Sequence, residues 1–345
     1  MAPLSRLVLT AATLLLTSVS AQAVTRYRVT DLGDLPGGTD HSYALGINDA
    51  GQVVGVGNHR PSSDSAFLWT ASRGMQNLGA NFSAAVDINN AGQIVGERYF
   101  ANQNQAFLWT ASRGMQALPL TRALGINRTG QVVGSNDSGV SLWTASGGVK
   151  ALGIFGDGEA INNAGQVVGW DRDGGAFLWT ASRGLQHLGQ LPGGSLSFAY
   201  DINDAGQVVG IAYDASDNAR AFLWTASRGM QDLGALPKQC PECPASYHSA
   251  YGINNAGQVV GVSDGRGFVW TAEVGMQDLN ALIDSPGTHV LEAMDINNLG
   301  QIAGEGYIHN KYHAVLLTPI PEPGRWALLV AGFGLTGLMV RCWRS

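Results

Sequence analysis

The stretch Ile-Asn-Asp-Ala-Gly-Gln-Val-Val-Gly at residues 47–55 decides the fold, because it recurs along most of the chain. Its Ile-Asn pair returns six more times, at intervals of 35 to 51 residues. These later copies begin at Ile88, Ile126, Ile161, Ile202, Ile253 and Ile296. A period of about 40 residues is typical of repeat folds in which each unit is one supersecondary structure. The architecture is therefore predicted from the unit and from the number of its copies.

Outward from this stretch, each unit consists of short strands separated by turns. The Asn-x-x-Gly that follows the isoleucine suits a tight hairpin, because asparagine bonds nearby backbone amides and glycine tolerates positive φ. We interpret these asparagines as turn residues, and a ring of ligands is the alternative. Gln-Val-Val, Phe-Leu-Trp-Thr and Met-Gln-x-Leu segments follow, and their β-branched and aromatic residues predict strands. Each unit thus predicts four antiparallel strands and no helix.

The strand types do not occur in equal numbers, and the imbalance predicts a closed ring. Six Trp-containing strands are each followed by a Met-Gln-type strand, but after Leu317 and Thr318 the chain runs into Pro319 with no such strand. A strand of the missing type stands at residues 27–33, before the first unit. If it pairs with the last unit, no sheet edge stays open. We therefore predict an all-β fold, a seven-bladed β-propeller over residues 24–319, with Trp and Phe side chains between blades. An open β-solenoid is the alternative.

Residues 1–23 predict a secretory signal peptide. Arg6 precedes an apolar run of about ten residues, and Ala21 and Ala23 form an A-x-A cleavage site. The alternative is an uncleaved membrane anchor, which needs about 20 apolar residues. We therefore expect a protein that works outside the cytoplasm.

Residues 320–345 differ in composition from the repeats. Pro321, Glu322 and Pro323 precede an apolar run over residues 326–340, and the chain ends with Arg341 and Arg344 among its last residues. A run of about 15 apolar residues with a basic end predicts a short membrane helix whose arginines stay inside.

Composition and motifs argue against several functional classes. The net charge of −6 lacks the basic character expected of a nucleic-acid-binding protein. The chain has no phosphate loop, nucleophile elbow or metalloprotease helix. We therefore predict no catalytic residues, no metal site and no cofactor. Acidic loop residues such as Asp171 and Asp214 are interpreted as solvated, with a calcium or acid/base role as the alternative.

Cys240 and Cys243 lie in the longest insertion between repeats. In an oxidising compartment, cysteines so close in sequence predict a small disulfide that stiffens the loop. The alternatives are redox-active thiols and a metal site with His248 as a further ligand. His309 and His313 are four residues apart on a predicted strand and loop, and we interpret them as surface residues.

Two resemblances add expectations about sorting and family. Pro321-Glu322-Pro323, the apolar run and the arginine-containing end resemble the PEP-CTERM sorting signal of exported bacterial proteins. That resemblance implies a tail held in the inner membrane, processing by an exosortase, and association with exopolysaccharide and biofilm. The repeats resemble the HAF family of extracellular repeat proteins, which implies export and a repeat architecture but no agreed activity. The histidine that names the family survives here only in His313-Ala314-Val315.

These expectations lead to a functional hypothesis with two rivals. We expect a non-enzymatic protein, secreted and then anchored by its tail or released to the cell surface. It would bind exopolysaccharide or another surface protein of the extracellular matrix through its loops. The first rival is a glycan-active hydrolase or lyase, which would need two or three carboxylates from different blades near the axis. The second is a purely structural repeat.

Overall fold

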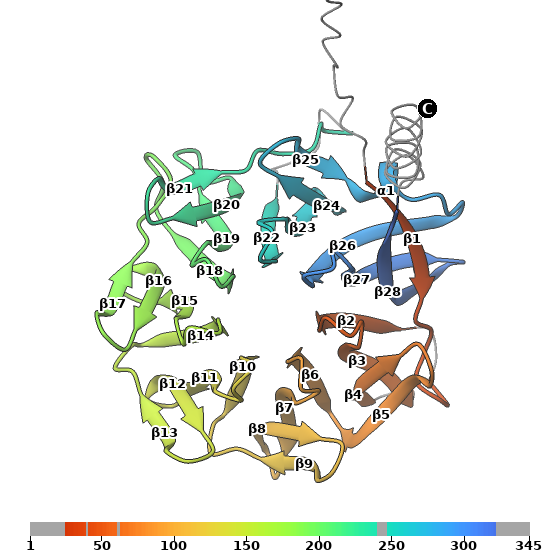
Figure 1. Cartoon of the computed structure of the whole chain (residues 1–345), viewed down its shortest axis with the longest axis horizontal. Helices are drawn as coiled ribbons and strands as arrows, with labels where there is room; N and C mark the ends of the chain where they lie inside the picture. The colour runs from red at the N-terminus through yellow and green to blue at the C-terminus, as the bar shows by residue number, and fades with distance from the viewer. Residues whose placement is uncertain (1–24, 39–40, 61–62, 240–246, 322–345) are drawn as a thin grey trace, which may run out of the picture. The chain divides into compact units, whose positions relative to one another are not determined.

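Seven four-stranded antiparallel sheets surround a central axis, so the all-β, seven-bladed β-propeller prediction is confirmed (Figure 1). The computed structural model describes residues 25–38, 41–60, 63–239 and 247–321. The propeller extends from Arg26 to Ile320. In each blade the first strand lies nearest the axis, and it ends at the isoleucine of the Ile-Asn pair.

The strands of the first four blades have the following bounds. Blade 1 contains β2 (Ser42–Ile47), β3 (Val53–Arg60), β4 (Ser63–Thr70) and β5 (Gly74–Asn81). Blade 2 contains β6 (Ser83–Ile88), β7 (Ile94–Phe100), β8 (Gln103–Thr110) and β9 (Gly114–Ala117). Blade 3 contains β10 (Arg122–Ile126), β11 (Val132–Asn136), β12 (Gly139–Thr144) and β13 (Gly148–Ala151). Blade 4 contains β14 (Gly156–Ile161), β15 (Val167–Asp171), β16 (Gly175–Thr180) and β17 (Gly184–His187).

The remaining three blades follow the same order, except that the last one takes a strand from the beginning of the chain. Blade 5 contains β18 (Ser197–Ile202), β19 (Val208–Tyr213), β20 (Ala219–Thr225) and β21 (Gly229–Asp232). Blade 6 contains β22 (His248–Ile253), β23 (Val259–Ser263), β24 (Arg266–Thr271) and β25 (Gly275–Asp278). Blade 7 contains β26 (Thr288–Ile296), β27 (Ile302–Ile308), β28 (Lys311–Ile320) and β1 (Arg26–Asp31).

The N-terminal strand β1 closes the ring. It pairs antiparallel with β28, with Arg26 opposite Ile320 and Asp31 opposite Val315. The Nδ1 atom of His313 lies 2.9 Å from an Asp31 carboxylate oxygen and adds a polar contact between the same strands. The predicted closure is confirmed, and the open solenoid is wrong.

The glycine that ends Gln-Val-Val-Gly is required for steric reasons in every blade. The first strand of each blade contains a register shift, as between Ala44 and Gly46 in β2, and its backbone there approaches the second strand closely. A Cβ atom on Gly55 would lie 1.9 Å from the backbone oxygen of Tyr43, and at Gly134 the same distance to Arg122 would be 2.0 Å. Only glycine fits this position.

The hydrophobic core lies between blades. Leu68 of blade 1, for example, shares a buried cluster with Ile88 and Phe107 of blade 2. Trp69, Trp179 and Trp224 are at most 8% exposed, so the prediction that the tryptophans pack between blades is confirmed for these three. Each blade therefore buries its apolar surface against both neighbours, as repeat architectures do.

One short helix was not predicted. It is α1 (Leu279–Leu282), which begins after Asp278, and the Asp278 side chain accepts a hydrogen bond from the Asn280 amide. Leu279 and Leu282 are buried against blades 6 and 7. A single capped turn is too short to produce a helical periodicity in the sequence.

Several predictions fall on residues outside the described ranges. These are the signal peptide with Ala21 and Ala23, the Cys240 and Cys243 pair, Glu322 and Pro323 of the sorting motif, and the C-terminal apolar run. Pro321 is the last described residue. Within the described ranges, no helix is long and apolar enough to cross a membrane.

Candidate functional site: the channel and the loop face

The ring has two faces with different chemistry. We call turn face the side that carries the Ile-Asn hairpins and the Thr-Ala-Ser-Arg-Gly turns. The loop face is the opposite side, formed by the connections between blades and by the hairpins that join second and third strands. The central channel runs between the two faces.

The Ile-Asn asparagines link the blades at the turn-face end of the channel. The Nδ2 group of Asn48 donates to Gln52 Oε1 at 2.7 Å and to the backbone oxygen of Asn89 in the next blade at 3.1 Å. Its Oδ1 atom accepts from the amides of Ala50 and Gln52 at 3.1 Å. The same bond to the next blade recurs around the ring until Asn297 donates to the backbone oxygen of Asn48.

This closed circle uses both donors and both acceptor positions of each asparagine side chain. The seven side chains are also only 3 to 5% exposed. They have no capacity left for a ligand, so the interpretation as turn residues is confirmed. The structure adds that these residues also join each blade to the next.

Three aspartates form the next layer of the channel. Asp87, Asp201 and Asp295 replace the glycine or alanine that precedes Ile-Asn in the other four units. Each carboxylate accepts from its own following isoleucine amide at 2.7 Å. Each also accepts from an isoleucine amide of the next blade, at 2.7 Å for Ile126 and 2.8 Å for Ile253 and Ile47.

The three aspartates border the channel but lie deep within the ring, which affects their acidity. Burial raises the pKa of Asp87 to about 6 and that of Asp201 to about 7, although the backbone amides oppose the shift. Burial also raises the pKa of Asp295 well above its ordinary value, and the charges of Asp201 and Asp87 add to the effect. The carboxyl groups of three blades therefore interact electrostatically across the axis.

Nearer the loop face, the channel becomes partly aromatic. A cavity of about 230 Å³ is lined by Glu159, Tyr200 and Tyr251 together with the three aspartates. Burial raises the pKa of Glu159 to about 7, with Arg122 opposing the shift and Asp157 reinforcing it. In blade 7, burial and then the neighbouring Glu292 raise the pKa of Glu305 to about 7.

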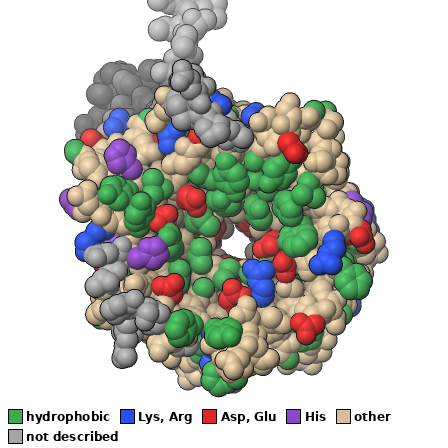
Figure 2. All heavy atoms as spheres, turned by 180° about the vertical axis from the view of Figure 1, so that it is seen from behind, with side chains coloured by type: hydrophobic (Ala, Val, Ile, Leu, Met, Phe, Trp, Pro, Cys, Tyr) green, Lys and Arg blue, Asp and Glu red, His purple; other side chains and the backbone are tan. Residues whose placement is uncertain are grey.

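The loop face exposes several aromatic side chains. Six described aromatic residues are between 44% and 66% exposed, and all six lie on loop-face segments. They are Phe82, Tyr99, Phe100, Phe155, Tyr247 and Tyr312. Figure 2 shows hydrophobic side chains gathered along one side of the channel opening, with acidic and basic side chains on the other side. The exposed large apolar residues of the turn face are aliphatic, for example Val274 and Leu299.

Phe155, Tyr247 and Phe82 occupy equivalent places in their blades. Each is the residue just before a first strand, and its backbone oxygen accepts from the amide of Arg172, Asp264 or Tyr99 in the second-strand segment of the same blade. Phe82 also has a φ of +53°, a conformation that bulky residues rarely adopt. Neither burial nor backbone geometry explains a phenylalanine there, so its exposed ring points to a role at the surface.

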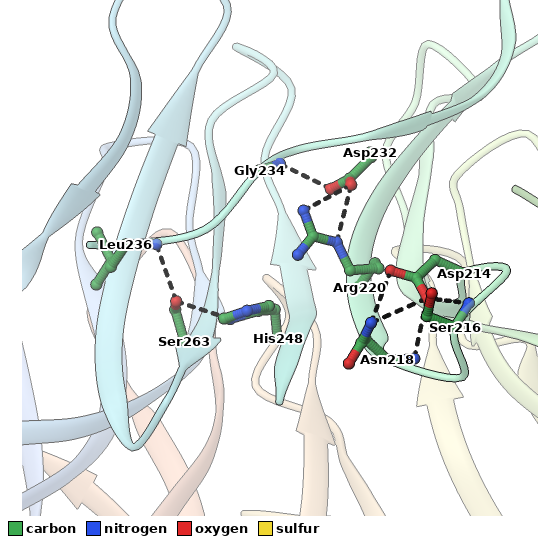
Figure 3. Close-up of polar contacts among 9 residues, drawn as sticks. All are labelled: Asp214, Ser216, Asn218, Arg220, Asp232, Gly234, Leu236, His248 and Ser263. Carbon is green, nitrogen blue, oxygen red and sulfur yellow. Dashed lines mark hydrogen bonds and ion pairs between the residues drawn. The ribbon is translucent and has the colours of Figure 1, made fainter. Parts of the chain in front are cut away.

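Asp214 and His248 have structural roles (Figure 3). Asp214 accepts from the amides of Ser216 and Asn218 at 2.8 and 3.0 Å, and so caps its own hairpin. His248 is 1% exposed, and its Nδ1 atom lies 2.9 Å from the Ser263 hydroxyl. The described part of the chain holds no group of three or more His, Cys, Asp or Glu residues able to bind a metal ion.

The surface prediction for His313 is wrong. His313 is only 8% exposed, because β1 covers it and supplies Asp31 as a partner. The acidic residues of the channel were not predicted from the sequence. Their signal was present in the Asp-Ile-Asn triplets, but it became interpretable only once the register of the first strand placed those aspartates at the axis.

Comparisons with known proteins assign no family and no activity to the chain. No protein-family model matches the chain, and no curated protein matches it. Among solved structures, the tricorn protease is similar over 82% of this chain at 9% identity and a TM-score of 0.41, and this chain spans only 31% of that protein. A Bacteroides thetaiotaomicron protein of unknown function has a TM-score of 0.46 at 10% identity, with coverages of 86% and 77%. The BP39L lectin from Burkholderia pseudomallei has a TM-score of 0.42 at 9% identity, with coverages of 86% and 98%.

Proposed function

We propose that this chain is an exported, non-enzymatic propeller that is sorted to the cell surface and binds exopolysaccharide of the extracellular matrix through its loop face. The observation that carries the proposal is the set of six exposed aromatic side chains on one face. Exposed aromatic rings bury large areas at little entropic cost when a partner binds. A sugar ring offers a flat apolar face to such a side chain and directs its hydroxyl groups to polar neighbours.

Binding to matrix polysaccharide tests the proposal. Phe82, Phe155 and Tyr247 are changed together to alanine, and the exported protein is co-sedimented with polysaccharide purified from the producing bacterium. We expect the dissociation constant to rise at least about tenfold, since each lost aromatic contact is worth about 1 kcal/mol. The matched control changes Leu185, Val274 and Leu299, which are 40 to 64% exposed and lie away from the loop face. Equal loss in both variants, or no binding by the wild type, contradicts the proposal.

The sorting part of the proposal rests on the two ends of the sequence. The A-x-A site at Ala21 and Ala23 supports export, and Pro321-Glu322-Pro323 with its apolar run supports recognition by an exosortase-type enzyme. Intact mass and cell fractionation in the native host test both. We expect a chain that starts at Val24 and lacks the segment after about Pro323, at the cell surface or in the matrix. A chain that retains residues 326–345 in the membrane fraction would mean a permanently anchored propeller.

A glycan-cleaving enzyme is the second candidate, because acidic groups from several blades surround one channel. Glu159 lines the channel and Glu305 lies on the second strand of blade 7, and both have pKa values raised to about 7, which suits a general acid. A reducing-end assay on the matrix polysaccharide tests this. Release of new ends by the wild type but not by Glu159→Gln or Glu305→Gln would support an enzyme.

A further inference from the structure

Two equivalent crevices lie between neighbouring blades on the turn face. The crevice between blades 4 and 5 has a volume of about 360 Å³, and the one between blades 5 and 6 about 820 Å³. Each is lined by the Ser-Arg turn and fourth strand of one blade and by a tryptophan of the next. The equivalent residues are Arg183 and Arg228, Gln186 and Gln231, and Trp224 and Trp270. The crevices therefore repeat with the blades.

The turn that borders the crevice is retained beyond what folding requires. Ala-Ser-Arg-Gly occurs unchanged at residues 71–74, 111–114, 181–184 and 226–229. The backbone explains its glycine, since φ lies between +65° and +72° in the four copies. It does not explain the arginine, which is exposed in each copy. Within the described ranges, none of these four guanidinium groups forms a hydrogen bond or an ion pair.

The loop-face segments belong to the same repeat units but have diverged from one another in both length and residues. If neither the turns nor the loops of the repeat units were under a functional constraint, both should have diverged to a similar extent. Since the exposed arginine is retained without a partner among the described residues, we infer that a requirement other than folding acts on the turn face.

Blade 3 shows that a positive charge in the crevice is the retained property. Its turn lacks the arginine, but Lys150 replaces the glutamine of the fourth strand. The Nζ atom of Lys150 lies 5.2 Å from the ring centroid of Trp179 in blade 4. The charge has thus moved from the turn to the strand and still lies beside the tryptophan of the next blade.

Blade 6 shows the complementary case. Its turn carries Glu273 and Val274 in place of the serine and arginine. The next blade has Leu317 opposite Ile302, where blade 1 has Trp69 opposite Val53. The cation and the tryptophan are therefore lost from the same crevice, which indicates that they act together.

We infer that the five crevices between blades 1 and 6 are repeated binding sites for the acidic sugar units of an anionic polysaccharide. The correspondence between repeat units assigns one cation to each crevice, namely Arg73, Arg113, Lys150, Arg183 and Arg228. A guanidinium group binds a carboxylate through paired hydrogen bonds, and the glutamine, serine and threonine side chains of the crevices suit sugar hydroxyl groups. The crevices also contain carboxylates that can accept from sugar hydroxyl groups, namely Asp204 in the first and Asp232 and Glu273 in the second. Successive crevices engage successive parts of one polymer, so weak contacts add up to useful avidity.

Other anionic partners fit the geometry less well. A bilayer surface is bound best by cations beside exposed apolar side chains, whereas the arginines of these two crevices lie among glutamine, serine and threonine side chains. The site is separate from the loop face, so it stands or falls independently of the function proposed above.

Binding of polygalacturonate to the full mature protein tests the inference. The test variant changes Arg73, Arg113, Arg183 and Arg228 to glutamine. The control variant changes four other exposed cations to glutamine, namely Arg26, Arg28, Arg172 and Lys238, and so has the same net charge. Thermal melts check that both variants are folded. We expect the wild type and the control to bind polygalacturonate more tightly than neutral dextran, and the test variant to lose at least about tenfold in affinity.

Three results would overturn the inference. The first is no preference of the wild type for polygalacturonate over dextran. The second is an equal loss in both variants, which would mean that only net charge matters. The third is crevice-dependent binding to phosphatidylglycerol vesicles without binding to polygalacturonate, which would identify a membrane-docking face. A Lys150→Gln change added to the test variant should weaken binding further, and no additional loss would exclude the crevice of blade 3.

Discussion

Removing one asparagine of the turn-face circle should destabilise the whole ring. Asn89→Ala eliminates four hydrogen bonds. Two are accepted from the amides of Ala91 and Gln93 at 3.0 Å. Two are donated, to Gln93 Oε1 at 2.8 Å and to the backbone oxygen of Asn127 at 2.9 Å. At about 1 kcal/mol for each buried bond, the free energy of unfolding falls by about 4 kcal/mol.

Calorimetry of the exported protein measures this loss. The propeller has about 300 residues, so its unfolding entropy near the melting temperature is about 0.6 kcal/mol/K, and the melting temperature should fall by about 6 °C. The control is Asn90→Ala, because Asn90 is exposed and, among the described residues, its side chain bonds only to Asp49. That change should lower the melting temperature by less than about 2 °C. Equal shifts for the two variants would refute the reasoning that the circle joins the blades.

Three further predictions follow from the channel and the strands. The free energy of unfolding should be highest near pH 4 to 5 and decline as the pH rises to about 7. The folded state raises the pKa of Asp87 and Asp201, so it holds protons that the unfolded chain has already released. Thermal melts across this range check the direction of the change, and the melting temperature of Asp201→Asn should depend less on pH. Gly134→Ala should abolish soluble expression, since its Cβ would lie 2.0 Å from a backbone oxygen. The control Gly114→Ala has free space around the new Cβ, and denaturant unfolding should show a free energy of unfolding lowered by only about 1 kcal/mol. Deletion of β1 should expose the edge of β28, and light scattering should then detect aggregation.

The sequence was sufficient to predict the fold because the prediction depended on counting. Seven copies of one unit and a fourth strand displaced to the beginning of the chain leave little choice of architecture. The burial of Trp69 and the turn role of Asn48 followed from the same unit. The circle of hydrogen bonds was not predicted, because a repeat pattern does not show which backbone oxygen of the next blade lies beside each asparagine.

The candidate site was less predictable, for physical reasons. Whether Asp201 or Glu159 points into the channel depends on the register shift in each first strand, and a shift of one residue turns a side chain to the other face. His313 looked like a surface residue because its cover, β1, is distant in sequence. The exposure of Phe82, and of Phe155 at the equivalent place in blade 4, likewise depends on how loops from neighbouring strands meet.

Hydrogen exchange of the exported protein, with and without polysaccharide from its own matrix, tests whether the loop face binds the polysaccharide. We expect slower exchange of the amides around Phe82, Phe155 and Tyr247 on the loop face when the polysaccharide is added. Unchanged exchange on the loop face under conditions where the polysaccharide is bound would contradict it.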